Sequence, residues 1–329
     1  MTPLSFGTQH AAAWDELQAL LADAEAGKKF DGARLSALYR ASCEHMALAQ
    51  SRAYPIHLVD RLEGLTQRAH QLVYRRQDFG LGRLKRLVLV DFPQAVRAHR
   101  RYLLVASLLF VLPALAVGIA TWRDPGFILH LMGADSVARF DQMYGGKEGA
   151  IGRERGADTD WEMFGFYIMH NIGIGFQCFA AGIFAGLGSA FFLVFNGLML
   201  GAVAAYLIGN GYSENFLSFV VTHSAFELTA IVLAGAAGLR LGHALLAPGR
   251  RTRVEALRHA AGAAVVVVYG VIGMLLIAAA VEAFWSSARW VAPQVKYGVA
   301  AVCWLLVLAY LAWQGRPATD APQGDSRAR

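Results

Sequence analysis

Charged residues are scarce in this chain of 329 residues. Asp, Glu, Lys and Arg together make up 16% of it, whereas a typical soluble domain carries about 25%. Hydrophobic residues make up 56%, and they gather in long runs instead of being spread along the chain. This distribution excludes an ordinary soluble globular protein and is typical of a membrane protein.

Cysteine is also rare, with three residues that lie far apart: Cys43, Cys178 and Cys303. They form no C-x-x-C pair, so we predict neither a disulfide framework nor a cysteine metal site. A cleavable signal peptide is missing from the first thirty or so residues, which are polar and have a helical pattern. We therefore expect the first membrane-crossing helix to act as the targeting signal.

Long apolar runs predict six membrane crossings and an all-α, polytopic fold. The first run, residues 102–122, would span about 30 Å as a helix, which matches the hydrocarbon core of a bilayer. The six runs are 102–122, 164–187, 189–208, 216–245, 259–284 and 297–313. Together they define a transmembrane domain over residues 102–313.

The flanking segments have different characters. In residues 1–79, Trp14, Leu17 and Leu21 recur at helical spacing, which predicts an N-terminal cytoplasmic domain of about three short helices.

Residues 80–101 mix apolar residues with six basic ones and predict a basic amphipathic helix at the interface, where 83–101 would meet anionic lipid headgroups. Nucleic-acid binding is not predicted, because a crossing helix follows at once. The Pro- and Asp-containing tail, 314–329, is expected to be disordered.

The charges of the loops predict the orientation. The loop 123–160 carries eight acidic residues, counting Glu162, against five basic ones, so we place it outside with a short helix near 127–143. The loop 248–258 is strongly basic and therefore cytoplasmic. Both termini then lie in the cytoplasm, and Glu282 would mark the outer end of the fifth crossing.

Six polar side chains lie at membrane depth in the second, third and fourth runs. They are His170, Asn171, Gln177, Asn196, His223 and Glu227. At 1.5 Å per residue they share one band between the outer third and the middle of the membrane. His223 and Glu227 are four residues apart and so share a helix face. An acidic residue in hydrocarbon costs at least ~2.5 kcal/mol, so Glu227 must be neutral, paired or hydrated.

Two interpretations of this band stay open. It is either a hydrogen-bonded network that holds helices together, or a site for a substrate headgroup, a proton or an ion. The pattern H-x-x-x-E supplies two metal ligands on one face, but the spacing assures no third ligand, so no metal and no cofactor are predicted. We find no nucleophile paired with a base, so no catalytic residue is predicted and the protein is not expected to be an enzyme.

Three G-x-x-x-G pairs predict close approach of helix backbones, because glycine removes the side chain at the contact. The glycines assigned to helix packing are Gly182, Gly186, Gly197, Gly201, Gly238 and Gly242.

A combination of these motifs resembles the stage II sporulation protein M family. The second helix carries Asn171, the third carries Asn196-Gly197-x-x-x-Gly201, and the fourth carries His223-x-x-x-Glu227-Leu228 followed by a glycine-rich exit. The resemblance extends over about residues 55–285 and includes the segment around His70 and the Phe92-Pro93 elbow.

The resemblance implies a polytopic protein of the bacterial cytoplasmic (inner) membrane. Its partners would be a MoxR-type ATPase or a peptidoglycan-processing protein, and self-association into a homo-oligomer is left open. The first functional hypothesis is a non-enzymatic component of an envelope-associated complex. The alternative is a transporter or a lipid-linked substrate flippase that uses the intramembrane His, Glu and Asn side chains. We do not carry the sporulation role over to this chain.

Overall fold

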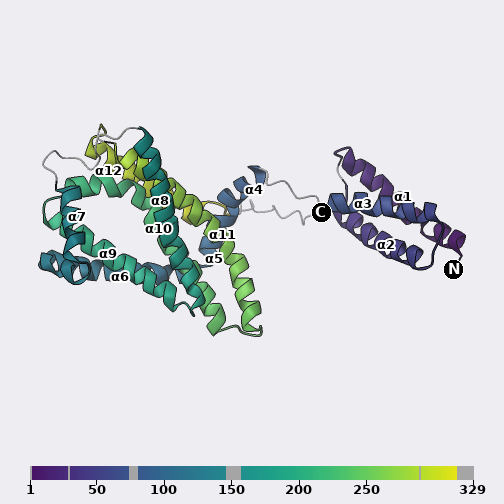
Figure 1. The fold of residues 1–329 in the computed structure, drawn as a ribbon, viewed down its shortest axis with the longest axis horizontal. Coiled ribbons are helices and arrows are strands. Elements are labelled where there is room, and N and C mark those ends of the chain that lie inside the picture. Colours follow the sequence, from purple (N-terminus) through teal and green to yellow (C-terminus); the bar gives the residue numbers. More distant parts are fainter. Residues whose placement is uncertain (1, 29, 74–80, 146–156, 289, 317–329) are drawn as a thin grey trace, which may run out of the picture. The chain divides into compact units, whose positions relative to one another are not determined.

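The computed structural model describes residues 2–28, 30–73, 81–145, 157–288 and 290–316. Within these ranges the regular structure is entirely helical, which confirms the all-α prediction (Figure 1). Contacts divide the chain into two compact units, residues 1–83 and residues 84–329, and each unit has a hydrophobic core of its own.

The N-terminal unit is a bundle of three helices, α1 (Pro3–Glu25), α2 (Gly32–Ser51) and α3 (Ile56–Val73). Side-chain caps define where the first two helices begin. The hydroxyl of Thr2 accepts from the N–H of Ser5, and the carboxylate of Asp31 accepts from two N–H groups in the first turn of α2. Trp14 and Leu17 are buried in the core, so the apolar residues that recur at helical spacing mark the side of α1 that faces the core.

Among the described residues of the second unit, six helices are long and apolar enough to cross a membrane, in agreement with the six predicted runs. They are α6 (Arg100–Arg123), α8 (Ala157–Ala180), α9 (Leu187–Gly209), α10 (Ser213–Leu246), α11 (Arg253–Ala280) and α12 (Pro293–Trp313). Two spans end in non-α turns. A 3₁₀ turn, η3 (Ala181–Ile183), follows α8, and a π-helix, η4 (Val281–Ser286), follows α11.

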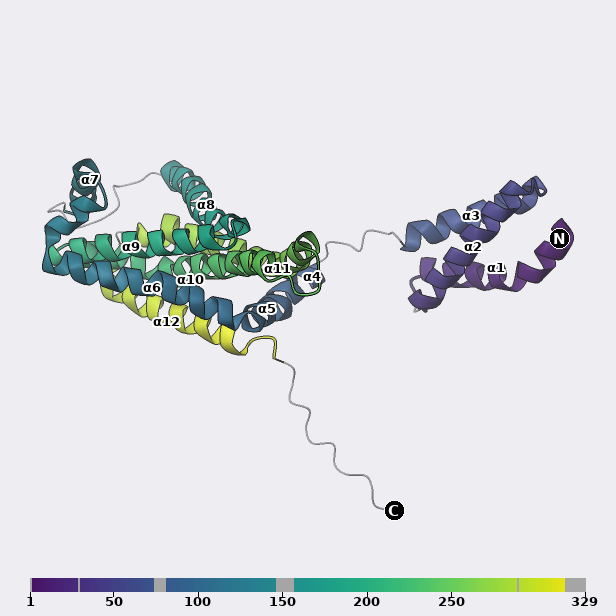
Figure 2. The ribbon, with the colours of Figure 1, turned by 90° about the horizontal axis from the view of Figure 1, so that it is seen from below.

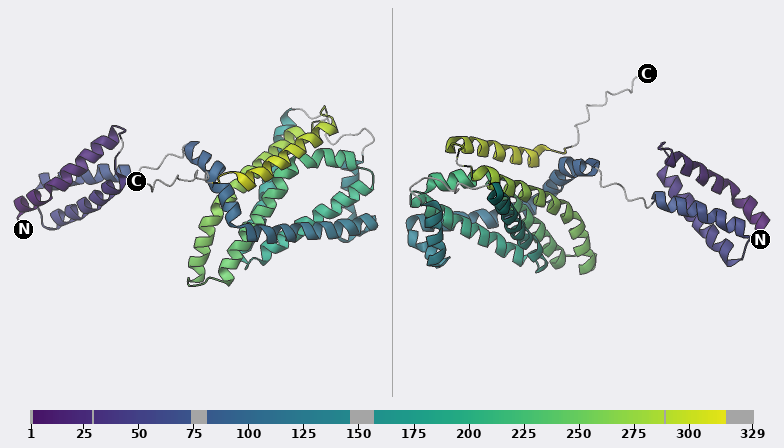
Figure 3. Two further views of the ribbon diagram at one scale, coloured as in Figure 1. Left: turned by 180° about the vertical axis from the view of Figure 1, so that it is seen from behind. Right: turned by 45° about the horizontal axis from the view of Figure 1, so that its top comes forward.

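The helix α10 is the centre of the membrane domain. It contacts α6, α8, α9, α11 and α12, and it contributes sixteen buried residues. In Figure 2, α6 and α9 run side by side along it while α12 covers another side. Helices α10 and α11 form a hairpin, drawn in green at the lower edge of the left view in Figure 3. A capping box between Thr252 and Glu255 begins α11 immediately after the turn.

The glycines of the G-x-x-x-G pairs lie where helix backbones meet. A Cβ atom at Gly197 or Gly201 would overlap the backbone of Phe110 or Ala114 on α6. On the other side of the domain, a Cβ atom at Gly182 would overlap Gly238 of α10, and one at Gly242 would overlap Gly186. Gly186 also has a φ of 83°, which lets the chain reverse between η3 and α9.

The basic segment predicted as one interfacial helix over 80–101 is divided in the structure. It consists of α4 (Leu81–Arg86), a π-helix η1 (Leu87–Asp91) and α5 (Phe92–Ala98), with a break at His99. The elbow is also less superficial than predicted, because Phe92 is buried against Gly270 of α11, which leaves space for the ring. Helix α4 has no buried residue, and Arg100 and Arg101 at the other end of the segment are exposed, so the buried part lies in α5 between them.

Short helices follow α6 in the loop predicted to be outside. They are η2 (Pro125–His130) and α7 (Ala134–Tyr144), and they correspond to the helix expected near 127–143. The hydroxyl of Tyr206 on α9 donates to Asp141, and the amide of Asn215 on α10 donates to the carbonyl of Tyr144. Residues 146–156 of this loop and 317–329 of the predicted disordered tail lie outside the described residues.

The first residues of the tail that the structure describes contact the elbow. The side chain of Gln314 donates to the carbonyl of Leu89 over 3.1 Å, and Gln94 donates to the carbonyl of Gly315 over 2.6 Å. The end of α12 is therefore tied to η1 and α5, and the segment expected to be disordered from 314 onward is ordered at its start.

Candidate functional site: a buried His–Glu–Glu cluster

The central helix α10 carries the first two members of a buried polar cluster. His223 lies ten residues after the first residue of α10, which places it about 15 Å along the helix. Glu227 follows one turn later on the same face, and its Oε2 lies 3.8 Å from Nε2 of His223. That separation is longer than a hydrogen bond, so the two groups face each other without a direct bond.

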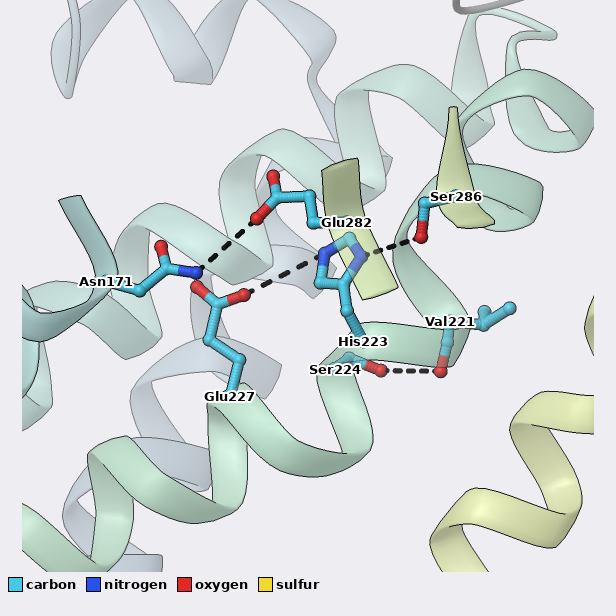
Figure 4. A network of polar contacts seen from close by, with 7 residues as sticks. All are labelled: Asn171, Val221, His223, Ser224, Glu227, Glu282 and Ser286. Atoms are coloured by element: carbon cyan, nitrogen blue, oxygen red, sulfur yellow. Dashed lines mark hydrogen bonds and ion pairs between the residues drawn. The ribbon is translucent and has the colours of Figure 1, made fainter. Parts of the chain in front are cut away.

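The third member is Glu282 in the π-helix η4. One ligand-type atom from each of His223, Glu227 and Glu282 lies within 4.8 Å of the other two. The amide of Asn171 on α8 points into the same space, and its Nδ2 donates weakly to Oε2 of Glu282 over 3.4 Å. Figure 4 shows these four side chains converging from α8, α10 and η4.

The other nitrogen of His223 is held by Ser286, the last residue of η4. Nδ1 of the imidazole lies 3.1 Å from Oγ of Ser286. The carbonyl of Ser286 accepts from the ammonium of Lys296, over 2.7 Å, at the start of α12. These contacts fix the rotation of the imidazole ring and leave Nε2 directed toward the carboxylates (Figure 4).

Burial makes this cluster costly. Asn171 is 1% exposed, His223 is 5% exposed, and the side chain of Glu227 is 18% exposed. Ionised carboxylates in such surroundings lose their hydration, and two of them close together also repel each other. The cluster therefore requires a compensating positive charge or bound protons.

Three residues of the predicted polar band lie elsewhere. His170 is exposed on α8 and stacks on the ring of Phe166, at a centroid distance of 5.8 Å. Gln177 is exposed on the same helix. Asn196 on α9 donates to the carbonyl of Phe192 over 2.7 Å, one turn back in its own helix. The predicted band of six is thus a cluster containing Asn171, His223 and Glu227, joined by Glu282.

The sequence placed Glu282 at the outer end of the fifth crossing as a boundary residue. Its role is missed because nothing in the spacing within α11 relates it to α10. A signal was nevertheless present, since Glu282 is a lone carboxylate within four residues of the end of a strongly apolar span. An acid in such a position is a candidate for an intramembrane site.

The arrangement can hold protons, a hydrogen-bond network or a cation. Ser286, His223 and Glu227 stand in the order of a nucleophile, a base and an acid, but this geometry does not support nucleophilic catalysis. Ser286 is 1% exposed, so a substrate carbonyl has no access to its hydroxyl, and Glu227 does not bond the imidazole. Cation and proton binding remain the chemistry that these side chains supply.

Comparison with protein families finds a match in each unit. A family described as Stage II sporulation protein M matches residues 104–287, and a domain of unknown function (DUF8413) matches residues 5–75. No curated protein and no solved structure matches the chain. The first match is shorter than the predicted 55–285, because the segments around His70 and Phe92 precede it, but it includes all four side chains of the cluster. Since it extends over more than half of the chain, this protein belongs to the stage II sporulation protein M family.

Proposed function

We propose that this protein is a non-enzymatic subunit of an envelope-associated complex in the bacterial inner membrane. The observation that carries the proposal is the N-terminal unit, which has its own buried core and matches a family description of its own. All residues of the polar cluster belong to the other unit. A helical domain that contains none of the candidate membrane spans is suited to binding a soluble partner.

The charge distribution supports a cytoplasmic position for this unit. Basic residues gather around the start of α6 and around the turn between α10 and α11, two places that four alternating crossings bring to the same side. They are Arg97, Arg100 and Arg101 at the first place, and Arg250, Arg251 and Arg253 at the second. An excess of Lys and Arg is typical of the cytoplasmic side of a membrane protein. The N-terminal unit precedes the first span and lies on this side in the proposed topology.

Two kinds of partner are consistent with the family resemblance, a MoxR-type ATPase and a peptidoglycan-processing protein. A cytoplasmic N-terminal unit favours the ATPase, because a wall enzyme works on the other side of the membrane. The exposed basic helix α4 adjoins the membrane domain and would place such a partner near anionic headgroups.

The test is affinity purification of the tagged full chain from native membranes in a mild detergent. The matched control is the same chain lacking residues 2–73, which keeps the six spans and the basic elbow. We expect a cytoplasmic ATPase with the full chain and its loss with the shortened chain. Recovery of neither an ATPase nor a wall enzyme with the full chain would count against a complex subunit.

A second candidate function is favoured by the buried cluster itself. Two carboxylates and an imidazole at membrane depth are suited to moving protons or cations. Two small cavities of about 10 and 50 Å³ lie in the described part of the membrane domain, but neither is lined by His223, Glu227 or Glu282. Of the transport alternatives, the ionisable side chains of the cluster favour ion or proton movement over a lipid-linked flippase.

Proteoliposomes containing a pH-sensitive dye test this candidate. A proton pathway through the cluster predicts flux with the native chain and none with Glu227→Gln, provided that the variant elutes as a folded protein. His170→Ala, on an exposed position of α8, is the matched control and should retain the flux. Equal flux in vesicles with the native chain and with Glu227→Gln would contradict a proton pathway through the cluster.

A further inference from the structure

We propose that His223, Glu227 and Glu282 bind one divalent transition-metal ion, of the Zn²⁺ or Mn²⁺ class, inside the membrane domain. The three side chains come from two different spans, α10 and the end of α11, and their ligand-type atoms lie within 4.8 Å of one another. This inference is independent of both functions proposed above, because it concerns a resident ion and is tested without a partner or a flux.

The distances suit a shared ion better than direct bonds. Metal–ligand bonds of about 2.1 Å separate ligand atoms by about 3.4 Å in a tetrahedral site and by about 3.0 Å between octahedral neighbours. Nε2 of His223 lies 3.8 Å from Oε2 of Glu227, which is too far for a hydrogen bond and slightly wider than these separations. The three ligand atoms lie within 4.8 Å of one another, so side-chain rotations would have to bring them closer for all three to bind one ion.

Charge balance also points to a divalent cation. Two carboxylates and one neutral imidazole carry a charge of −2, so an ion of charge +2 makes the site neutral overall. A neutral complex avoids the cost of holding uncompensated ions in a low-dielectric interior. No Lys or Arg side chain bonds either carboxylate among the residues that the structure describes. The nearby ammonium of Lys296 instead donates to the carbonyl of Ser286.

The surroundings of His223 resemble the outer shell of a metal site. A metal-bound histidine usually donates its second ring N–H to an oxygen, which fixes the tautomer and the ring. Here Nδ1 lies 3.1 Å from Oγ of Ser286, and in the tautomer whose Nδ1–H donates to this oxygen, Nε2 has a lone pair for an ion. Asn171 is 1% exposed and points into the cluster, so turning its amide would offer Oδ1 as a fourth ligand (Figure 4).

The ligand set selects the class of metal. Mg²⁺ and Ca²⁺ prefer all-oxygen sites, whereas an imidazole nitrogen with carboxylates is suited to Zn²⁺ and to other first-row divalent ions. An ion at this position would join α10, the end of α11 and, through Asn171, helix α8. It would therefore hold together the elements around the buried end of the central helix.

The experiment uses the purified full chain in detergent, stripped with a chelator and then dialysed against Zn²⁺, Mn²⁺ or Mg²⁺. We expect one Zn²⁺ or Mn²⁺ per chain by elemental analysis, a higher midpoint of thermal unfolding with the metal, and no comparable binding of Mg²⁺. Glu282→Gln and Glu227→Gln keep the side-chain volume and should weaken the affinity at least tenfold. Two matched controls, His170→Ala on α8 and His10→Ala in the N-terminal unit, should bind as the native chain does.

Two results would overturn the proposal. One is a folded native chain that takes up no stoichiometric Zn²⁺ or Mn²⁺. The other is a Glu282→Gln variant that binds the metal with native affinity. If the glutamine variants fail to fold, Co²⁺ added to the native chain decides instead. Ligand-field absorption of bound Co²⁺ that is displaced by one equivalent of Zn²⁺ supports the site, and its absence refutes it.

Discussion

Nε1 of Trp14 on α1 donates a hydrogen bond to Nδ1 of His45 on α2, over 3.1 Å, in the core of the N-terminal unit. The imidazole of His10 packs against that of His45, with ring centroids 3.9 Å apart. The pKa of His45 is lowered from its usual value of 6.5. The larger cause is burial, and the smaller is the neighbouring His10. The bond from Trp14 requires a neutral ring, because a protonated Nδ1 cannot accept.

This contact predicts that acid destabilises the N-terminal unit. Since the pKa of His45 is lower in the folded state, the unfolded chain binds more protons below about pH 6.5. The contribution of His45 is complete above that pH and is lost as the pH falls through the folded pKa. We expect the urea midpoint of residues 1–83, followed by the fluorescence of Trp14, to fall with pH. His45→Gln keeps an acceptor that does not titrate, and an unchanged pH slope in that variant would contradict the assignment.

The separate core of residues 1–83 predicts that this unit folds when expressed alone, as a soluble helical protein by circular dichroism. Leu17 is fully buried, and Leu17→Ala should cost about 2–5 kcal/mol of unfolding free energy through lost burial and a residual cavity. Leu4→Ala makes the same chemical change at a position that is 80% exposed and should leave the urea midpoint nearly unchanged. Similar losses in the two variants would show that the core is placed elsewhere.

The contact between α6 and α9 predicts that a Gly→Ala substitution destabilises the protein at Gly201 but not at a glycine outside the contact. A Cβ at Gly201 would overlap the carbonyl of Ala114, so Gly201→Ala must push the two helices apart. Gly262 on α11 is exposed, and a Cβ added there would meet no atom within 4 Å, so Gly262→Ala should cause no loss. Thermal unfolding in detergent compares them, and an equal midpoint for Gly201→Ala and the native chain would mean that the helices are not in contact.

The proposed orientation predicts the labelling of single cysteines in intact cells. After replacement of Cys43, Cys178 and Cys303 by serine, Asp135→Cys on α7 should react with a membrane-impermeant maleimide from outside. Arg251→Cys, in the turn between α10 and α11, should react only after the membrane is opened. The reverse pattern would place the termini outside, and it would also contradict the proposal that the N-terminal unit binds a cytoplasmic partner.

Much of the architecture follows from the sequence, because membrane spans are defined by local composition. The run over residues 102–122 contains no charged residue, and the observed helix extends one or two residues beyond it at each end. The glycines could also be assigned, since close backbone approach restricts a position to the smallest residue. The Phe92-Pro93 elbow was harder to predict from the sequence, because the burial of Phe92 depends on Gly270, which lies far away in the chain.

The cluster was only half predictable for the same reason. His223 and Glu227 are related by helix periodicity, and that pattern can be read along one segment. Depth alone grouped His170 and Gln177 with them, but depth carries no information about rotation, and both side chains are exposed on α8. The position of Glu282 depends on the packing of α11 against α10 and on the local winding of the chain, neither of which spacing within one helix reveals.

Because η4 is wound as a π-helix, the geometry of the cluster depends on the number of residues in this segment. A π-helix arises when one residue is added to an α-helix without extending it by a full step, and it changes the direction of every later side chain by about 100°. The turn Val281–Ser286 carries both the carboxylate that faces Glu227 and the hydroxyl that orients His223. Removal of a single apolar residue between them, with no polar side chain altered, would separate the acid from the group that orients its neighbour. In related chains, the length of this turn is therefore as informative as the identity of the polar residues.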